Sequence, residues 1–219
     1  MNGTCDFEGD YYQTGMRWYR AKYVSLADET GKCYRVIGRL DDINDIIIKQ
    51  DQLRLAAQVD AVTGIYNKNY AIFAIATALR KKRAGSTDAV LFLDIDNFKA
   101  INDTFGHLEA DEVLRQIGVI LQGMFRKDDI VARFGGDEFI VYMKSAADPE
   151  SIAAKADSIL LAVHGIKIGD AKPVCCSIGI ASVTEEEISY NEVLKRADKA
   201  LYEAKKNGKN QYVVLGWRD

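Results

Sequence analysis

The stretch that most constrains the fold is residues 130–143, IVARFGGDEFIVYM. Two apolar, β-prone runs interrupted by a glycine pair predict an antiparallel hairpin. Glycine tolerates positive φ and lets a ligand approach the backbone closely, and Gly135 and Gly136 are followed at once by Asp137 and Glu138. The hairpin tip is therefore expected to present two carboxylates, although a solvated Gly-Gly-Asp turn is also common in hairpins without a site.

A second acidic stretch favours the functional interpretation. Residues 89–95 form a nearly continuous apolar run that ends in Asp94 and Asp96, which is typical of a strand buried on both faces. A buried acid is costly unless it is paired or bound to a metal. Asp94 and the acids of the glycine turn therefore predict oxygen ligands for divalent cations, as phosphoryl-transfer sites use.

Composition limits the classes of function. The 219 residues, 48% of them hydrophobic, allow one core of ordinary size and a small appendage. The net charge of −3 argues against nucleic acid as a partner. Without a signal peptide or a membrane-length apolar run, this chain is expected to make no membrane contact, whereas attachment of a longer parent chain stays open. Four cysteines without disulfide or metal-finger spacing predict reduced core residues and a cytoplasmic location: Cys5, Cys33, Cys175 and Cys176.

The first 40 residues predict a small β-structure. Residues 1–15 are polar and glycine-rich without periodicity, so we expect them to be poorly ordered. Residues 16–26 and 32–40 are strand-like and flank a turn with glycine, which predicts a β-hairpin. The order RWYR (17–20), DETGK (28–32), RVIG (35–38) and DDI (41–43) resembles the last strands of a PAS sensory domain. A lone hairpin is only marginally stable, so we expect it to need a partner surface. Because the strands and helices that would enclose a ligand in such a domain are absent upstream, we interpret 1–40 as a truncated sensor.

Residues 41–59 predict a linker helix. Five residues recur at alternating spacings of three and four, the a/d pattern of a short coiled coil, and all but the glutamine are apolar: Ile43, Ile46, Gln50, Leu53 and Ala57. The same spacing also fits a helix that packs on its own domain. Two heptads are too few to dimerise strongly by themselves.

Residues 60–219 predict one larger domain of the α+β class. The expected fold is ferredoxin-like or palm-type, with a central antiparallel sheet flanked by helices, after an N-terminal β-hairpin and a linker helix. The first half of the domain is expected to contain a helix over 68–83 ended by Gly85, a strand over 89–95, a loop, a helix over 107–125 and the hairpin. The second half is expected to contain a helix from Asp148-Pro149 to Gly165, a strand over 172–183, a helix with a capping box of Ser189 and Glu192, and a strand over 211–215.

Five motifs of this domain closely resemble the GGDEF family of diguanylate cyclases. They are DAVTGIYNK (60–68), DIDNFKAINDTFGH (94–107) running on to Asp111, RFGGDEF (133–139), SIGIA (177–181) and ADKALYEAKKNGKN (197–210). The resemblance implies that two GTP-loaded subunits of a homodimer face each other. The 3′-hydroxyl of each GTP attacks the α-phosphate of the other, which gives cyclic di-GMP and two pyrophosphates.

The resemblance also implies a metal site. Asp94 and Asp137 would bind two Mg²⁺ or Mn²⁺ ions in each half-site, with help from the backbone carbonyl of Ile95. Glu138 would either complete the metal site or assist deprotonation of the attacking hydroxyl. Such catalysis consists mainly of positioning and neutralisation of charge.

The GTP triphosphate has its own implied ligands. Lys99, Lys205 and Lys209 would hold it together with the backbone amides near Asn97 and Phe98. Lys99 would also serve catalysis. Lys209 stands where the family usually has arginine, so the charge is kept and the bidentate grip is lost.

The guanine base is implied to meet Asn102 and Asp111. A carboxylate accepts hydrogen bonds from guanine N1–H and its 2-amino group, which adenine does not offer in that arrangement. Taken alone, Asn102 also fits a loop cap and Asp111 a first-turn helix acid. Ala110 replaces the usual glycine before Asp111, which would disturb the pocket if that position needed unusual dihedral angles.

Arg126 and Asp129 match the family's Arg-x-x-Asp inhibitory site, which implies feedback by cyclic di-GMP. Arginine can stack on a guanine while an aspartate takes the donors of the base, although an exposed salt bridge would give the same spacing. Two other functions compete with an active cyclase: a catalytically weak module that senses GTP or cyclic di-GMP, and a cyclase of altered base specificity. The intact Asp94, Asp137 and Lys99 favour the active enzyme.

Overall fold

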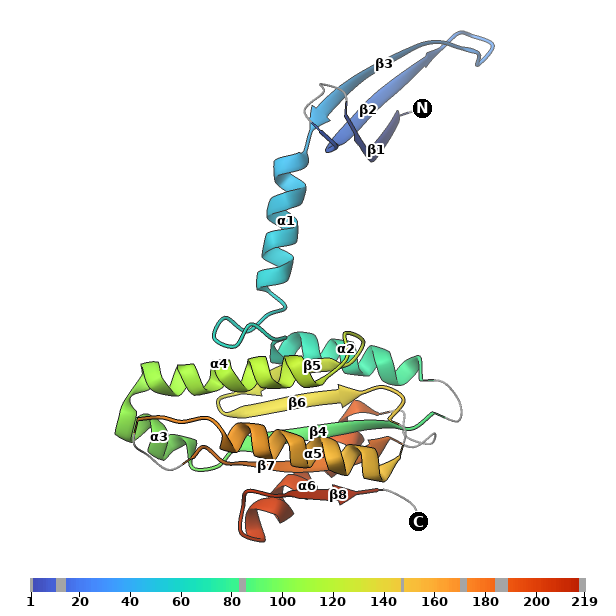
Figure 1. The fold of residues 1–219 in the computed structure, drawn as a ribbon. Coiled ribbons are helices and arrows are strands. Elements are labelled where there is room, and N and C mark those ends of the chain that lie inside the picture. Colours follow the sequence, from blue (N-terminus) through green and yellow to red (C-terminus); the bar gives the residue numbers. More distant parts are fainter. Residues whose placement is uncertain are drawn as a thin grey trace. The chain divides into compact units, whose positions relative to one another are not determined.

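The computed structural model divides into two compact units, Met1–Ala56 and Ala57–Asp219 (Figure 1). Within them the structure describes residues 2–10, 15–82, 86–146, 148–169, 173–183 and 189–216. No helix in these described ranges is long and apolar enough to cross a membrane. All four cysteines are free, as their spacing predicts, but Cys5 and Cys33 are exposed, so the expected core position is wrong for these two, whereas Cys176 is buried.

The first unit is a three-stranded antiparallel sheet followed by a helix. The elements are β1 (Asn2–Gly9), β2 (Arg17–Ala27), β3 (Cys33–Asp42) and α1 (Asn44–Ala56), and the strand order is β1-β2-β3. The predicted hairpin is confirmed as β2 and β3.

The expected disorder of residues 1–15 is wrong for the described part of that stretch, because β1 pairs with β2 from Asn2 to Gly9. Two cross-strand contacts supply the reason. Asp6 forms an ion pair with Arg20, which is directly opposite, at 2.7 Å, and the rings of Phe7 and Tyr19 lie 6.2 Å apart. These partners are distant in sequence, so the composition of the stretch itself did not reveal them.

The predicted a/d stripe begins just before α1. Ile43 is buried, whereas Ile46 and Leu53 are 51% and 62% exposed. Gln50 is exposed as well. Within the described residues, most of this stripe therefore faces solvent in a single chain.

The second unit is an α+β domain with a five-stranded sheet. In chain order it contains α2 (Lys68–Arg80), β4 (Asp88–Ile95), α3 (Phe98–Phe105), α4 (His107–Met124), β5 (Ile130–Gly135), β6 (Glu138–Met143), α5 (Pro149–His164), β7 (Cys176–Val183), α6 (Tyr190–Lys206) and β8 (Tyr212–Leu215). The strand order β5-β6-β4-β7-β8 confirms the ferredoxin-like prediction. Among the neighbouring strands that the structure describes in this sheet, β7 and β8 alone pair in parallel, because the crossover through α6 returns the chain in the same direction.

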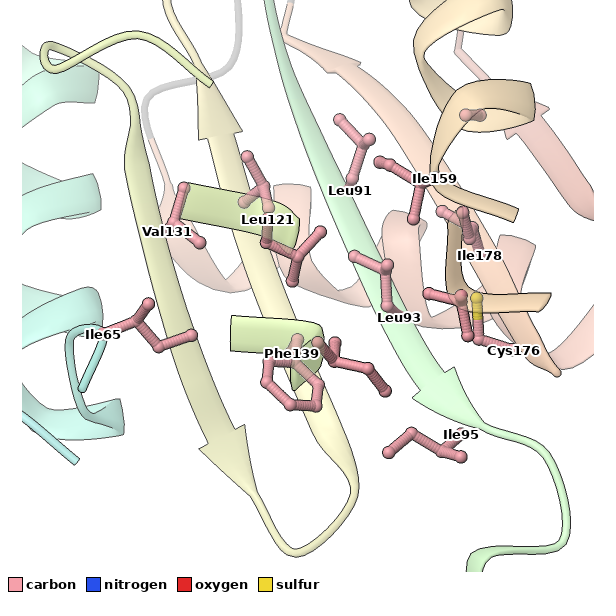
Figure 2. Close-up of a cluster of buried hydrophobic side chains, with 14 of the residues drawn as sticks. Ile65, Leu91, Leu93, Ile95, Leu121, Val131, Phe139, Ile159, Cys176 and Ile178 are labelled. Carbon is pink, nitrogen blue, oxygen red and sulfur yellow. The ribbon is translucent and has the colours of Figure 1, made fainter. Parts of the chain in front are cut away.

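The sheet carries an apolar core on each face. Residues of β4 alternate between the two: Leu91 and Leu93 pack with the α4 and α5 side, whereas Val90 and Phe92 pack with the α2 and α6 side. Figure 2 shows the first of these clusters, with Leu121 of α4 and Ile159 of α5 among its members. Since side chains alternate along a strand, the next even-numbered residue of β4, Asp94, points towards the α2 and α6 side.

Several predicted boundaries shift. The helix predicted over 68–83 ends at Arg80, and Gly85 lies outside the described residues. The stretch predicted as a loop before residue 107 contains α3. Residue 172, the predicted start of a strand, is also outside the described part, and β7 begins at Cys176.

The predicted helix caps have mixed outcomes. Asp148 caps α5 through a 2.7 Å bond that its carboxylate accepts from the Ser151 N–H, and Pro149 opens the helix, as predicted. Ser189 is the N-cap residue of α6, but its side chain makes no capping hydrogen bond. The predicted capping box with Glu192 is therefore wrong: the Glu192 N–H donates to the Ser189 carbonyl instead, at 3.2 Å.

Candidate functional site

Asp94 lies at the centre of the candidate site because β4 and β6 bring it opposite Glu138. The two residues are partners in the antiparallel register, so their side chains share one face of the sheet. Asp94 is only 9% exposed. The Lys205 Nζ of α6 lies 2.8 Å from Asp94 Oδ2, which places a lysine of the last helix against the acid of the central strand.

The hairpin tip is fixed to the end of β4. Gly136 has φ of +48°, a conformation that favours glycine. The Ile95 N–H donates to the Asp137 carbonyl at 3.2 Å. This bond holds the backbone of Asp137 beside the residue that follows Asp94.

Four carboxylates consequently lie close enough to influence one another: Asp94, Asp96, Asp137 and Glu138. Burial raises the pKa of Asp94, and the charges of Asp137 and Asp96 raise it further, against the lowering effect of Lys205. Burial also raises the pKa of Glu138, and Asp94 and Asp137 add to the shift. Such mutual repulsion is the situation that a bound divalent cation relieves.

The donor set fits a metal chemically, because carboxylate and backbone oxygens are what Mg²⁺ and Mn²⁺ prefer. Among the described residues, however, no three His, Cys, Asp or Glu side chains stand at metal-ligand spacing. In this structure the neighbouring positive charge at Asp94 comes from Lys205.

A second acid at the end of β4, Asp96, organises the neighbouring turn. It is 7% exposed and accepts hydrogen bonds from Ser177 Oγ at 2.8 Å and from the Asn210 N–H at 2.9 Å. Lys209 has φ of +63° in that turn, and its Nζ donates to Asn97 Oδ1 at 2.7 Å. The sequence places Asp96 at the end of the strand but indicates no role for it. In the structure it links β4 to β7 and to the turn that contains Lys209.

The start of α3 carries the other predicted phosphate ligands. Asn97, in the left-handed region at φ of +59°, is the N-cap residue. Phe98 packs against the core, and Lys99 is exposed in the first helical turn. The first N–H groups of a helix lack intrahelical partners and favour anions, so this end of α3 offers donors close to the Lys209 side chain.

The predicted base-binding residues lie on both sides of Gly106, the residue between α3 and α4. Asn102 is inside α3 and Asp111 is inside α4 beyond its first turn, so neither the loop-cap nor the first-turn explanation holds. Within the described residues, Asn102 Oδ1 is buried without a hydrogen-bond partner. Ala110 belongs to the regular part of α4 and is not among the positive-φ residues, so the replacement of glycine introduces no backbone strain.

Arg126 and Asp129 are not brought into this group. They form the turn before β5, whereas Gly135 is at the other end of that strand. The length of the extended strand separates the turn from Gly135 by roughly 20 Å. Asp129 accepts the Arg126 N–H at 2.9 Å and the Lys144 N–H at 3.1 Å. Among the described residues no ion pair joins the Arg126 and Asp129 side chains, so the salt-bridge alternative does not hold.

The Arg133 side chain forms a brace that supports the hairpin tip, a role that the sequence alone does not indicate. Arg133 donates through Nε and Nη2 to the Gly136 carbonyl, at 3.0 and 2.7 Å, and through Nη1 to Asp60 Oδ1 at 3.1 Å. Asp60 also accepts from Thr63 Oγ1 at 2.8 Å. Burial alone would raise the pKa of Asp60, but the bonds from Thr63 and Arg133 outweigh burial and hold that pKa below its usual value. Arg133 and Asp60 both belong to the family motifs, which is the sequence signal that could have pointed to this brace.

Comparisons with known proteins point in one direction. The family model described as "Diguanylate cyclase, GGDEF domain" matches residues 57–211. The chain is 34% identical over 204 residues to a diguanylate cyclase of Vibrio cholerae, with 91% of this chain and 63% of that protein covered. It is 31% identical over 199 residues to the cyclic di-GMP phosphodiesterase PdeR of Escherichia coli, with 90% and 30% covered. The chain thus spans less than two thirds of the length of either relative.

A solved structure is similar as well. The coiled coil and GGDEF domain of DgcB from Caulobacter crescentus, in complex with c-di-GMP, matches with a TM-score of 0.74 and 27% identity. The match covers 79% of this chain and 93% of that one.

Proposed function

Since the chain belongs to the GGDEF family of diguanylate cyclases, we propose that it condenses two GTP molecules into cyclic di-GMP and two pyrophosphates. The observation that carries the proposal is the convergence of Asp94, Asp137 and Glu138 with Lys205 at one end of the sheet. An acidic cluster beside lysines suits phosphoryl transfer, because the reaction needs both metal ligands and phosphate ligands.

In the proposed site, Asp94 and Asp137 hold Mg²⁺ or Mn²⁺, two ions in each half-site, with the Ile95 carbonyl as a further ligand. Bound cations would polarise the α-phosphate and neutralise its charge. The raised pKa of Glu138 suits either proposed role, since a carboxyl that titrates closer to neutral pH is a better base and a cation would stabilise its charged form.

The triphosphate is proposed to bind at the start of α3. The free N–H groups near Asn97 and Phe98 and the Lys99 side chain provide donors. Lys209 already reaches Asn97 Oδ1, and Lys205 lies at Asp94. Both lysines can therefore meet phosphate oxygens without moving to another part of the domain.

The guanine is proposed to bind between α3 and α4. Asn102 Oδ1 is a buried acceptor that needs a donor. Guanine N1–H and its 2-amino group are donors, and Asp111 accepts from the same edge of the base. Adenine lacks that pair of donors, so GTP is the proposed substrate and ATP is disfavoured.

Regulation and assembly complete the proposal. Residues 1–40 act as a PAS-type sensory segment, 41–59 as a signalling linker helix, and 60–219 as the cytoplasmic catalytic domain. Two copies form a homodimer so that their half-sites meet, and the exposed Ile46 and Leu53 of the linker stripe support this pairing. Product feedback acts at Arg126 and Asp129.

The direct test is chromatographic analysis of products from GTP and Mg²⁺ over a range of protein concentrations. We expect cyclic di-GMP, with a specific rate that rises with protein concentration because two half-sites must meet. Asp137→Ala should abolish the product, whereas Asp157→Asn on the exposed surface of α5 should not. Binding of GTP without product at any concentration would contradict the proposal and favour a sensing module.

A further inference from the structure

The sheet of the first unit has one face that is nearly free of charge. In the strand register, Ala21 of β2 lies opposite Cys5 of β1 and Leu40 of β3. Because side chains alternate along each strand, these residues share one side of the sheet with Tyr23. The Tyr23 ring lies across Gly3 and leaves no room there for a Cβ atom. We call this side the uncharged face, and it includes Cys5, Ala21, Tyr23, Tyr34, Val36 and Leu40.

The opposite face of the same sheet is charged. Asp6 and Arg20 pair there at 2.7 Å, and Lys22 lies directly opposite Arg39. Along the described strands, the charged side chains on the uncharged face are those at its end, Arg17 and Asp42, and they pair with each other at 2.9 Å. An antiparallel sheet with this contrast typically packs its apolar face against another layer.

Most of the uncharged face is open in a single chain. Tyr34 is 66% exposed, Val36 61%, Tyr23 43% and Leu40 39%, and Cys5 is exposed as well. With three strands about 4.8 Å apart and about 3.4 Å per residue, the flat area of the face is roughly 400 Å². A contiguous apolar patch of this size on a soluble protein marks an interaction surface.

The charge pattern favours a second copy of this chain as the occupant. In a two-fold dimer the same patch meets itself, so any unpaired charge on it would be set against its own copy. The uncharged face avoids that repulsion because Arg17 and Asp42 neutralise each other. The opposite face, with Lys22 beside Arg39, would not avoid it.

The area of the face also fits such a dimer. A stable dimer usually buries about 800 Å² on each partner, so the face supplies about half of that area. Helix α1 begins at Asn44, two residues after β3 ends at Asp42, and its exposed Ile46 and Leu53 add apolar surface. Pairing through the sheet and the linker helix together is therefore expected to be reversible and dependent on protein concentration.

We propose that the uncharged face binds the same face of a second copy, so that the two sheets stack about 10 Å apart as a β-sandwich around a two-fold axis. This inference rests on the proposed homodimer and adds the N-terminal sheet to its interface. The stacked sheets hold two chains together before their half-sites meet.

The test measures the dimer dissociation constant of the purified chain by sedimentation equilibrium. Val36→Lys should raise it at least about 10-fold, because the two-fold axis places two unpaired charges in the apolar interface. The matched control is Ile37→Lys, since Ile37 is the next residue of β3, is 55% exposed and lies on the charged face. The control should leave the dissociation constant unchanged. The thermal midpoint of each variant checks folding.

The Cys5 thiol gives a second readout that does not depend on a substitution. A bulky thiol reagent should modify Cys5 more slowly as the concentration of the unsubstituted chain rises, because the second copy covers it. In Val36→Lys the rate should stay constant over the same range. Slow modification at every concentration would mean that the face is covered within one chain, which overturns the second copy as its occupant.

The remaining outcomes separate the sheet interface from the proposed cyclase. A monomer at every concentration overturns the interface, and so do equal dissociation constants in Val36→Lys and Ile37→Lys. If the unsubstituted chain still forms cyclic di-GMP from GTP and Mg²⁺ in those cases, the proposed function stands without the sheet. A weakened dimer in Val36→Lys alone supports the interface, even if the unsubstituted chain forms no product and the cyclase is thereby overturned.

Discussion

The two ends of the β5–β6 hairpin use acids in opposite ways. At the tip, Asp137 and Glu138 crowd Asp94, and the pKa values of Asp94 and Glu138 rise because burial and mutual repulsion disfavour their charged forms. At the other end, the Asp129 carboxylate is satisfied by two backbone N–H groups. An acid whose charge the protein compensates only in part, as Lys205 does for Asp94, is suited to a further cationic partner, whereas an acid satisfied by backbone donors is suited to a structural role.

The brace at the tip gives the sharpest test of that comparison. Arg133→Ala removes the donors to the Gly136 carbonyl and leaves the Asp60 carboxylate, whose side chain is 23% exposed, without its cation. We expect a loss of about 2–3 kcal/mol in the free energy of unfolding, measured by urea denaturation. Product formation should also fall, because the turn that carries Asp137 loses its support.

The matched control for the brace is Arg115→Ala. Arg115 pairs with Glu112 on the exposed surface of α4, and such pairs contribute roughly 1 kcal/mol or less. An equal loss of stability in the two variants would show that the brace is worth no more than a surface ion pair, and the tip would then need another explanation for its geometry.

Substitution of Asp129 should lower the free energy of unfolding less than substitution of Arg133 does. Asp129→Ala leaves the Arg126 and Lys144 N–H groups without their acceptors, so we expect the free energy of unfolding to fall by about 1–2 kcal/mol. Asp128→Ala is the control, since Asp128 is the exposed neighbour and no effect beyond about 0.5 kcal/mol is expected on an ordinary surface position. If both variants unfold at the same urea concentration, Asp129 does not hold the turn, and its carboxylate is then available to a ligand.

The sequence predicted the sheet and its acids because those signals are local. The apolar run of β4, the glycine pair and the amphipathic spacing of α4 each lie within one element. Side-chain alternation then puts Asp94 on the same face as Val90 and Phe92, which is the face that α2 and α6 cover in the structure.

The missed features depend on contacts between distant segments. The helix α3 has only eight residues, none of them fully buried, and begins from a left-handed Asn97. Phe98, Ile101 and Phe105 recur at helical spacing and pack against the core, but the run is shorter than the length by which a helix is recognised from sequence. The partners in β1 and in the Arg133–Asp60 pair are separated by long stretches of chain. Such pairs are set by tertiary structure, which overrides local preference.

The smallest expected effect is the contribution of the Asp60 charge to the Arg133 brace, which the pH dependence of the free energy of unfolding should show. The pKa of Asp60 is lowered in the folded state, so its contribution is fully present above the unfolded value, about 3.9, and is lost as pH falls through the folded pKa. The free energies of unfolding of the unsubstituted chain and Asp60→Asn should therefore differ on the order of 1 kcal/mol at neutral pH. That difference should shrink steadily below about pH 4. A gap that stays constant with pH would mean that Asn loses hydrogen-bond geometry rather than charge, and the ionic part of the Arg133 brace would be refuted.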